Sequence, residues 1–284
     1  MVSLVIEKLL GPMPPGQFIR DHYTRLPHSV PGGALGLTSF DGWPSVGAIL
    51  AAPGVDAFLA REGRMDEDPA PPSPEKARES LRRGFTLVIR SAERHDPELA
   101  RLAAGFAADF KAPVNVHVYA TPAGHSGFGW HYDPEDVFVL QTHGVKEYRL
   151  RKNTVHPWPV LESMPRDLRL EREVTPSWSC TLSPGDWLYI PTGWWHCARG
   201  VEESLTLAVG LMTPSALDFL DFIRQELAGS LPWRRRLPVP GAADPRDDRE
   251  KTLELSEIGR ELGRDLARAL GDEETARRFW SRTR

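Results

Sequence analysis

Between residues 114 and 212 the chain consists of short runs of β-branched and aromatic residues that alternate with turn signals. Asp136-Val-Phe-Val-Leu-Gln141 is followed by a Thr-His-Gly turn and then by Lys146-Glu-Tyr-Arg-Leu150. Runs of this kind, bounded by glycine and proline, are typical of antiparallel strands joined by tight connections. The segment therefore predicts a mainly β fold with added helices, in which a double-stranded β-helix, or jelly-roll barrel, has an open mouth.

Three side chains within this segment could hold one metal ion. His131 and Asp133 are two residues apart, and a strand would project both to the same face because its side chains alternate. His196 lies far along the chain, so only a folded sheet could bring it to the other two. Two imidazoles and one carboxylate suit Fe(II) and leave three coordination positions open, whereas structural zinc prefers a fourth protein ligand or thiolates. We therefore expect an iron site ahead of Zn(II) or Mn(II).

A lysine on the following strand adds a second constraint. Lys146, Tyr148 and Leu150 fall on one face of this strand by alternation. An ammonium on an inward face is costly unless an anion meets it. A dicarboxylate cosubstrate would be such an anion.

The same residues carry a resemblance to a known family. The run His131-Tyr-Asp-Pro-Glu-Asp-Val-Phe-Val-Leu-Gln141, followed by Gly144-Val-Lys146, resembles the JmjC-type 2-oxoglutarate oxygenases, which have a cupin-like barrel. The nearest branch is the ribosomal oxygenases, which share the Thr121-Pro122 dipeptide and a motif like Pro191-Thr-Gly-Trp-Trp-His196. The resemblance covers roughly residues 115 to 212, and Pro184-Gly185-Asp186 falls in the expected order.

This resemblance implies a role for each matching residue. His131, Asp133 and His196 would be the catalytic Fe(II) ligands, and Lys146 would pair with the distal carboxylate of 2-oxoglutarate. The further cosubstrate contacts it implies are Tyr119 and Thr121 as pocket walls, with Ser204 and Thr206 as hydrogen-bond candidates. The chain departs from relatives at His117, where asparagine is frequent, and at Tyr148, where tryptophan is more usual.

The implied activity is a dioxygenase that uses Fe(II), 2-oxoglutarate and dioxygen to hydroxylate an amino-acid side chain in a protein or peptide, with succinate and CO2 as coproducts. Rim loops at residues 28–40, 66–74 and 122–130 would select the substrate. Three alternatives remain open: an N-methyl demethylase with the same iron chemistry, a small-molecule or natural-product hydroxylase, and a non-catalytic cupin scaffold that binds metal. Formaldehyde release would distinguish the first of these, and a closed pocket the second.

The ends of the chain suggest two domains. Residues 1–212 would form the catalytic domain, with helical and mixed elements before the barrel, including helices near residues 14–23, 44–50, 75–83 and 97–110 and a strand at 85–90. Thr213 could cap a helix whose first residue is Pro214. Residues 213–284 carry leucines and isoleucines at helical spacing, so we expect a helical region and a possible homodimer interface.

Composition narrows the remaining choices. The chain has 284 residues, of which 40% are hydrophobic, and contains no apolar stretch that approaches the length of a membrane helix. Its first residues do not resemble a secretory signal, so we expect a cytoplasmic protein whose two cysteines, Cys180 and Cys197, are free thiols. The net charge of −4 argues against direct nucleic-acid binding.

Overall fold

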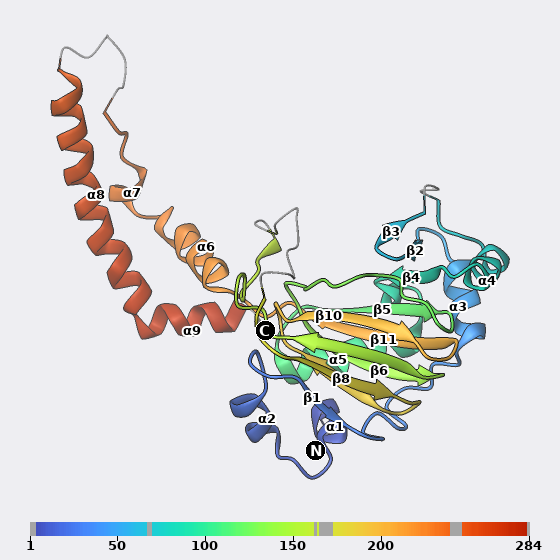
Figure 1. The fold of residues 1–284 in the computed structure, drawn as a ribbon. Helices are drawn as coiled ribbons and strands as arrows, with labels where there is room; N and C mark the ends of the chain where they lie inside the picture. The colour runs from blue at the N-terminus through green and yellow to red at the C-terminus, as the bar shows by residue number, and fades with distance from the viewer. Residues whose placement is uncertain (1–3, 67–69, 162–163, 165–172, 239–245, 283–284) are drawn as a thin grey trace. The chain divides into compact units, whose positions relative to one another are not determined.

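The computed structural model describes residues 4–66, 70–161, 164, 173–238 and 246–282 (Figure 1). The chain divides into two compact units, Met1–Thr213 and Pro214–Arg284. In the described part of the chain, no helix is both long enough and apolar enough to cross a membrane.

Helices of the first unit begin where the sequence supplies their start signals. Ser73 accepts a hydrogen bond from the Lys76 amide, and Asp96 accepts from the amides of Glu98 and Leu99, which satisfies amides at two helix N-termini. The predicted helices are confirmed within a residue or two at their ends. The helices are α1 (Val5–Leu10), α2 (Pro15–Asp21), α3 (Trp43–Leu50), α4 (Pro74–Arg82), the 3-10 turn η1 (Ala92–Arg94) and α5 (Pro97–Phe110).

The strands form two antiparallel sheets. The eight-stranded sheet has the order β1-β9-β6-β11-β5-β4-β2-β3, and the three-stranded sheet has the order β10-β7-β8. The strands are β1 (His28–Val30), β2 (Asp56–Arg61), β3 (Arg64–Met65), β4 (Thr86–Arg90), β5 (Val114–Thr121), β6 (Asp136–His143), β7 (Lys146–Arg151), β8 (Ser177–Leu182), β9 (Trp187–Ile190), β10 (Trp195–Gly200) and β11 (Ser204–Leu211).

The two sheets face each other, as a jelly roll requires. One buried cluster joins Val139 of β6 and Leu188 of β9 from the large sheet to Tyr148 and Leu150 of β7 from the small one. Among the described residues, named strands do not close the sheets into a continuous barrel, but the isolated bridge between His131 and His196 reaches across one edge. The expected jelly-roll class is confirmed.

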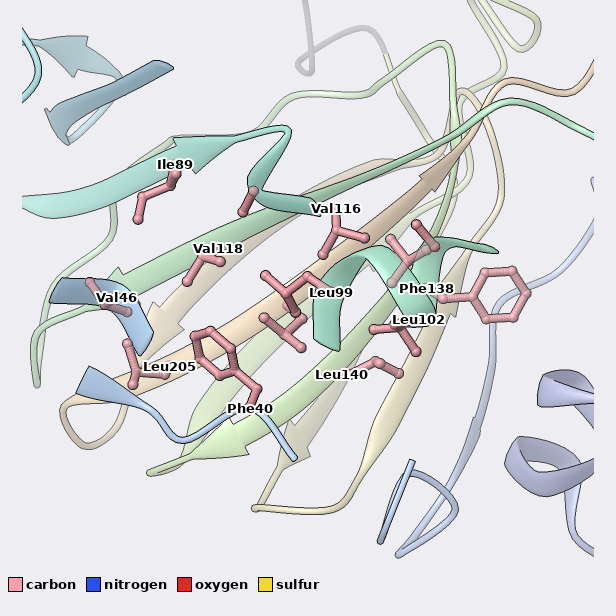
Figure 2. Close-up of a cluster of buried hydrophobic side chains, with 14 of the residues drawn as sticks. Phe40, Val46, Ile89, Leu99, Leu102, Val116, Val118, Phe138, Leu140 and Leu205 are labelled. Atoms are coloured by element: carbon pink, nitrogen blue, oxygen red, sulfur yellow. The ribbon is translucent and has the colours of Figure 1, made fainter. Parts of the chain in front are cut away.

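The other face of the large sheet is covered by helices. Leu99 and Leu102 of α5 pack against Val116 of β5 and Phe138 of β6, and all four are buried (Figure 2). Strand alternation places Val116, Val118 and Ala120 on this helix-covered face and turns the intervening residues of β5 toward the small sheet. On β5, the inner face of the large sheet thereby carries His117, Tyr119 and Thr121.

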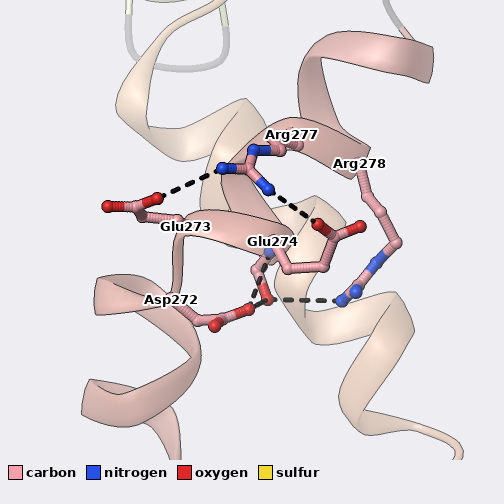
Figure 3. Close-up of polar contacts among 6 residues, drawn as sticks. Asp272, Glu273, Glu274, Arg277 and Arg278 are labelled. Carbon is pink, nitrogen blue, oxygen red and sulfur yellow. Dashed lines mark hydrogen bonds and ion pairs between the residues drawn. The ribbon is translucent and has the colours of Figure 1, made fainter.

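The second unit is helical and consists of α6 (Ala216–Leu227), α7 (Leu231–Arg234), α8 (Asp248–Gly271) and α9 (Glu273–Arg282). Phe222, Ile223 and Phe279 form its small buried core. Figure 3 shows the start of α9, where Asp272 accepts from the Thr275 amide and hydroxyl, at 2.8 Å each.

The predicted cap at Thr213 is wrong. Helix α6 is capped by Ser215, whose hydroxyl accepts from the Asp218 amide while the Asp218 carboxylate accepts from the Ser215 amide. Thr213 is engaged elsewhere, because its hydroxyl donates to the buried Asp136 carboxylate at 2.8 Å and bonds the Tyr23 hydroxyl at 2.7 Å. A tertiary network therefore displaces the start of the helix.

Candidate metal centre

The three expected metal ligands come together in the fold. His131 and Asp133 lie in the segment before β6, and His196 lies in β10. The His131 amide donates to the His196 carbonyl at 3.0 Å, and the reciprocal bond is 2.8 Å. One possible ligand atom from each of the three side chains lies within 4.8 Å of the other two. The set can therefore hold a single ion.

The local backbone differs from the predicted strand. His131 makes one isolated bridge, and the residues that follow it are irregular until β6 begins. The Gly193 amide donates to the Asp133 carbonyl at 2.9 Å, so the turn before β10 holds this segment in place. Strand alternation still holds at Tyr132, which is buried edge-to-face against Trp195. The common face of His131 and Asp133 thus depends on contacts from outside their own segment.

Each histidine is oriented by a backbone carbonyl. The Nδ1 atom of His131 is 2.9 Å from the Gly129 carbonyl, and the Nδ1 atom of His196 is 3.0 Å from the Trp194 carbonyl. A carbonyl can only accept, so each Nδ1 carries a proton, which leaves Nε2 as the ring atom that a metal ion could bind. This is the usual outer-sphere arrangement for metal-binding histidines. The Nε2 atom of His196 is 3.4 Å from Oδ2 of Asp133.

Electrostatics in the triad favour a bound cation. Burial raises the pKa of Asp133, but the hydrogen bond and charge of His196 outweigh burial and hold this pKa well below its ordinary value. Burial and the neighbouring His196 lower the pKa of His131, which keeps its ring neutral. Burial also lowers the pKa of His196, yet the contact with Asp133 raises it overall. A carboxylate and two oriented imidazoles fit a divalent ion such as Fe(II).

A cavity of about 590 Å³ opens beside the triad, between the two sheets. Side chains from both sheets and from the loop before β6 form its walls. They include the apolar Val137, Val139 and Ile190, the aromatic Phe58, Tyr119, Phe128 and Tyr148, and the polar Arg90, His117, Thr121, Glu135, Lys146 and Thr206. This volume is within the usual range for a small-molecule site.

Lys146 is a buried cation in this cavity. Its side chain lies at the start of β7, and the residue is 5% exposed. The Nζ atom is 5.5 Å from the Tyr119 ring centre and 5.6 Å from that of Tyr148, and no ion pair or hydrogen bond to this ammonium occurs among the described residues. Burial lowers the pKa of Lys146 to about 7. An anion bound in the cavity would offset this cost.

The other expected cosubstrate contacts divide into two groups. Tyr119, Thr121 and Thr206 line the cavity, and the register places Tyr119 directly opposite Thr206. The Thr206 hydroxyl donates to Oε1 of Gln141 at 3.0 Å, and the Thr121 hydroxyl is buried without a hydrogen-bond partner among the described residues. Ser204 is buried two residues before Thr206 in β11 and does not line the cavity. Its hydroxyl is 3.4 Å from the Thr121 carbonyl.

Sequence reasoning did not include Glu135 or Arg90 in the site, although both line the cavity. Strand alternation from Tyr119 back to His117 would have predicted that the cavity wall formed by β5 extends beyond Tyr119. No sequence signal would have brought Arg90 here, because β4 reaches the cavity only through its pairing with β5. Cys180 and Cys197 are free, as expected.

Parts of this chain are similar to proteins of known families. The JmjC domain family matches residues 90–219. A bifunctional lysine-specific demethylase and histidyl-hydroxylase NO66 from Drosophila persimilis is 26% identical over 262 residues, covering 82% of this chain and 36% of the relative. Ribosomal oxygenase 2 from Mus musculus is 35% identical over 130 residues, covering 44% of this chain and 26% of the relative. The chain therefore spans 36% and 26% of the length of these two relatives.

Solved structures show the same fold. Escherichia coli YcfD superposes with a TM-score of 0.63 at 18% identity, covering 95% of this chain and 71% of that one. The structure of YcfD described as a ribosomal oxygenase in complex with cobalt and 2-oxoglutarate gives a TM-score of 0.62 at 19% identity, covering 96% of this chain and 71% of that one. Residues 90–219 match the JmjC domain family, and the chain is similar to relatives named as histidyl-hydroxylases and ribosomal oxygenases.

Proposed function

We propose that this chain is an Fe(II)- and 2-oxoglutarate-dependent dioxygenase that hydroxylates an amino-acid side chain in a protein or peptide. The observation that carries the proposal is one cavity with two complementary features. It holds an oriented two-histidine, one-carboxylate set, and it holds the buried ammonium of Lys146, which has no anionic partner among the described residues. A metal-chelating dicarboxylate would satisfy both.

Each residue of the site would have a separate binding role. His131, Asp133 and His196 would hold Fe(II), and Lys146 would bind the distal carboxylate of 2-oxoglutarate beside Tyr119. When bound, Fe(II) and 2-oxoglutarate together supply oxidative activation of dioxygen, with succinate and CO2 as coproducts. The protein orients the cosubstrate, and its apolar β6 and β9 side chains exclude water from the inner wall.

A protein substrate is supported by the relatives. Those similar over most of this chain are named as histidyl-hydroxylases or ribosomal oxygenases, and the structural neighbour is named as a ribosomal oxygenase. The NO66 name also includes lysine demethylation. Succinate formation without formaldehyde would support hydroxylation, whereas formaldehyde released in step with succinate would support demethylation.

The test is anaerobic titration of the metal-free protein with Fe(II) and then with 2-oxoglutarate. Chelation of the ion by the 2-oxo acid produces a weak visible charge-transfer band, which we expect in the native protein. Lys146→Met should leave Fe(II) binding intact and raise the 2-oxoglutarate concentration required for the band by about tenfold or more, because one charge-assisted contact is lost. Lys8→Met changes an exposed lysine on α1 and serves as the control.

Two results would reject the proposal. Iron binding without a band would exclude cosubstrate chelation, and an unchanged 2-oxoglutarate requirement in Lys146→Met would exclude the assigned carboxylate partner. Metal-dependent thermal stabilisation without any turnover would instead favour a metal-binding scaffold.

We further propose that residues 1–212 carry the catalysis and that 213–284 form a dimerisation segment. Helix α8 leaves Leu255 and Leu270, which lie on one side of the helix, 47% and 43% exposed, so a second copy of the chain could cover them. Leu255→Glu should convert a dimer to a monomer in analytical ultracentrifugation, while Arg264→Glu on the opposite side of the same helix should not. A native protein that sediments as a monomer would refute this.

A further inference from the structure

One carboxylate of the large sheet is buried without a cation. Asp136 is the first residue of β6 and is 0% exposed. Among the described residues, no lysine, arginine or histidine forms an ion pair with it. Burial raises the pKa of this carboxyl, because a charge inside the fold loses its hydration. A buried carboxylate of this kind is stable only where hydrogen-bond donors replace the lost water.

Three donors from distant parts of the chain surround Asp136. The Tyr189 hydroxyl of β9 donates to its Oδ1 atom, and the Thr213 hydroxyl donates to Oδ2 at 2.8 Å. The third donor is the backbone amide of Thr192, which is 3.2 Å from Oδ1. The two hydroxyls fix the carboxylate in the interior of the first unit. The amide belongs to the turn that precedes the metal ligand of β10.

This turn connects the two parts of the metal centre. Residues 191–194 are closed by a 3.1 Å hydrogen bond from the last amide to the first carbonyl. The Gly193 amide donates to the Asp133 carbonyl at 2.9 Å, and the Thr192 hydroxyl lies 3.4 Å from the same carbonyl. The last carbonyl of the turn orients the ring of His196. The turn therefore contacts one ligand segment and leads directly into the other.

Asp136 contacts the turn from the same segment that carries Asp133. The two residues are three positions apart, and the turn bonds the backbone carbonyl of the first and the carboxylate of the second. Two contacts at separate points fix both the distance and the tilt of the turn, whereas one contact alone would allow rotation about it. Because Tyr189 and Thr213 hold Asp136 from the other side, the position of the turn is set by the core.

We propose that Asp136 is a positioning residue for the metal centre, which sets the place of His196 relative to the His131 and Asp133 segment by holding the Thr192 amide. The proposal rests on the dioxygenase function proposed above and adds a residue that does not line the cavity. Asp136 acts through the backbone of the turn. Because a metal ion requires its donors at fixed separations, loss of this contact should weaken metal binding as well as the fold.

The test is calorimetric titration of the full metal-free chain with Mn(II), together with urea unfolding of the same samples. Asp136→Ala should weaken Mn(II) binding by about tenfold or more, the effect of losing an outer-sphere partner. Asp136→Asn keeps an acceptor oxygen for the Thr192 amide and should remain within about threefold of the native affinity. Leu99→Ala removes a buried side chain on the helix-covered face of the large sheet. It should lose stability and retain the native Mn(II) affinity.

A second pair of variants breaks the same contact from the side of the turn. Gly193 has φ +74° and Thr192 does not have a positive φ, so the turn is of type II, which favours proline at the Thr192 position. Thr192→Pro puts a ring carbon in the place of the donated proton, whereas Thr192→Ala keeps the amide and loses only the hydroxyl. The proline variant should weaken Mn(II) binding about as much as Asp136→Ala, and the alanine variant should weaken it less.

The combined variant separates positioning from a general loss of stability. Asp136→Ala together with Thr192→Pro should bind Mn(II) no more weakly than either single variant, because both changes break one contact. If Asp136→Ala does not fold, the two Thr192 variants decide the outcome.

Several results would overturn the assignment. They are native Mn(II) affinity in Asp136→Ala or in Thr192→Pro, an equal loss in Asp136→Asn, and an equal loss in Leu99→Ala, which would trace weaker binding to lower stability alone. In each case the native chain still binds Mn(II), so the dioxygenase function survives. If the native chain binds no Mn(II), the proposed function and the Asp136 assignment fail together.

Discussion

Lys146→Met should stabilise the metal-free protein while it weakens 2-oxoglutarate binding. Burial lowers the pKa of Lys146 from 10.5 to about 7. Each pH unit of such a change corresponds to about 1.4 kcal/mol, so the buried ammonium costs the folded state about 5 kcal/mol at about pH 6. Methionine has a similar volume and carries no charge, and it removes this cost apart from small packing differences.

The sign of the pH dependence follows from proton binding. Between about pH 7 and 10.5 the unfolded chain keeps the Lys146 proton that the folded chain has released, so the native protein becomes more stable as the pH rises. The advantage of the methionine variant should therefore shrink from about 5 kcal/mol at about pH 6 to about 2 kcal/mol at about pH 9.

Urea unfolding of the two metal-free proteins, followed by tryptophan fluorescence at both pH values, measures this difference. Lys8→Met provides the control and should match the native protein at each pH, because Lys8 is exposed. A methionine variant no more stable than native protein at the lower pH would refute the reasoning, since it would mean that Lys146 already has a partner in the metal-free fold.

Three further perturbations test the construction of the site. Asp133→Ala should weaken Mn(II) binding by more than about a hundredfold in calorimetric titration, beyond the effect of losing an outer-sphere partner, and near-native affinity would remove Asp133 from the ligand set. Gly193→Ala should cost at least about 1 to 2 kcal/mol of unfolding free energy, because Gly193 has φ +74° and a Cβ there would meet the Pro157 carbonyl. Gly16→Ala meets nothing within 4 Å and should be tolerated, so equal losses at both glycines would contradict this account. Phe138→Ala should lose about 3 to 5 kcal/mol in urea unfolding, because Phe138 is fully buried among Phe18, Phe106 and Tyr189, and a loss below about 1 kcal/mol would show that this core can collapse into the space.

Helix prediction succeeded where local signals are strong. The helix expected at residues 97–110 is α5, which begins after the Asp96 cap with proline at its first position. The hairpin of β2 and β3 was not predicted; β3 has only two residues and lies at the edge of the large sheet, beside β2. The cap of α6 was misplaced because Thr213 bonds Asp136 and Tyr23, which are distant in sequence. Local sequence propensity contains no information about partners that are distant in sequence.

The candidate site likewise contains residues that the sequence could predict and one whose position relative to the cavity it could not predict. The sequence alone nominated His131, Asp133, His196 and Lys146, since residue type and motif order survive without knowledge of the fold. It could not locate Ser204 relative to the cavity, because alternation fixes the face of a strand but not the point at which a cavity ends.

The sequence by itself determined the chemistry available to this protein: a jelly-roll pattern, a metal-binding donor set and a lysine in need of an anion. The tertiary structure alone decided how the donors are aimed, since the Gly129 and Trp194 carbonyls orient the rings and the Gly193 amide fixes the Asp133 segment. It also decided that the buried Asp136 carboxylate bonds an amide of the turn before β10. These features depend on backbone groups and sheet register that bring distant residues together, and no local sequence pattern encodes them.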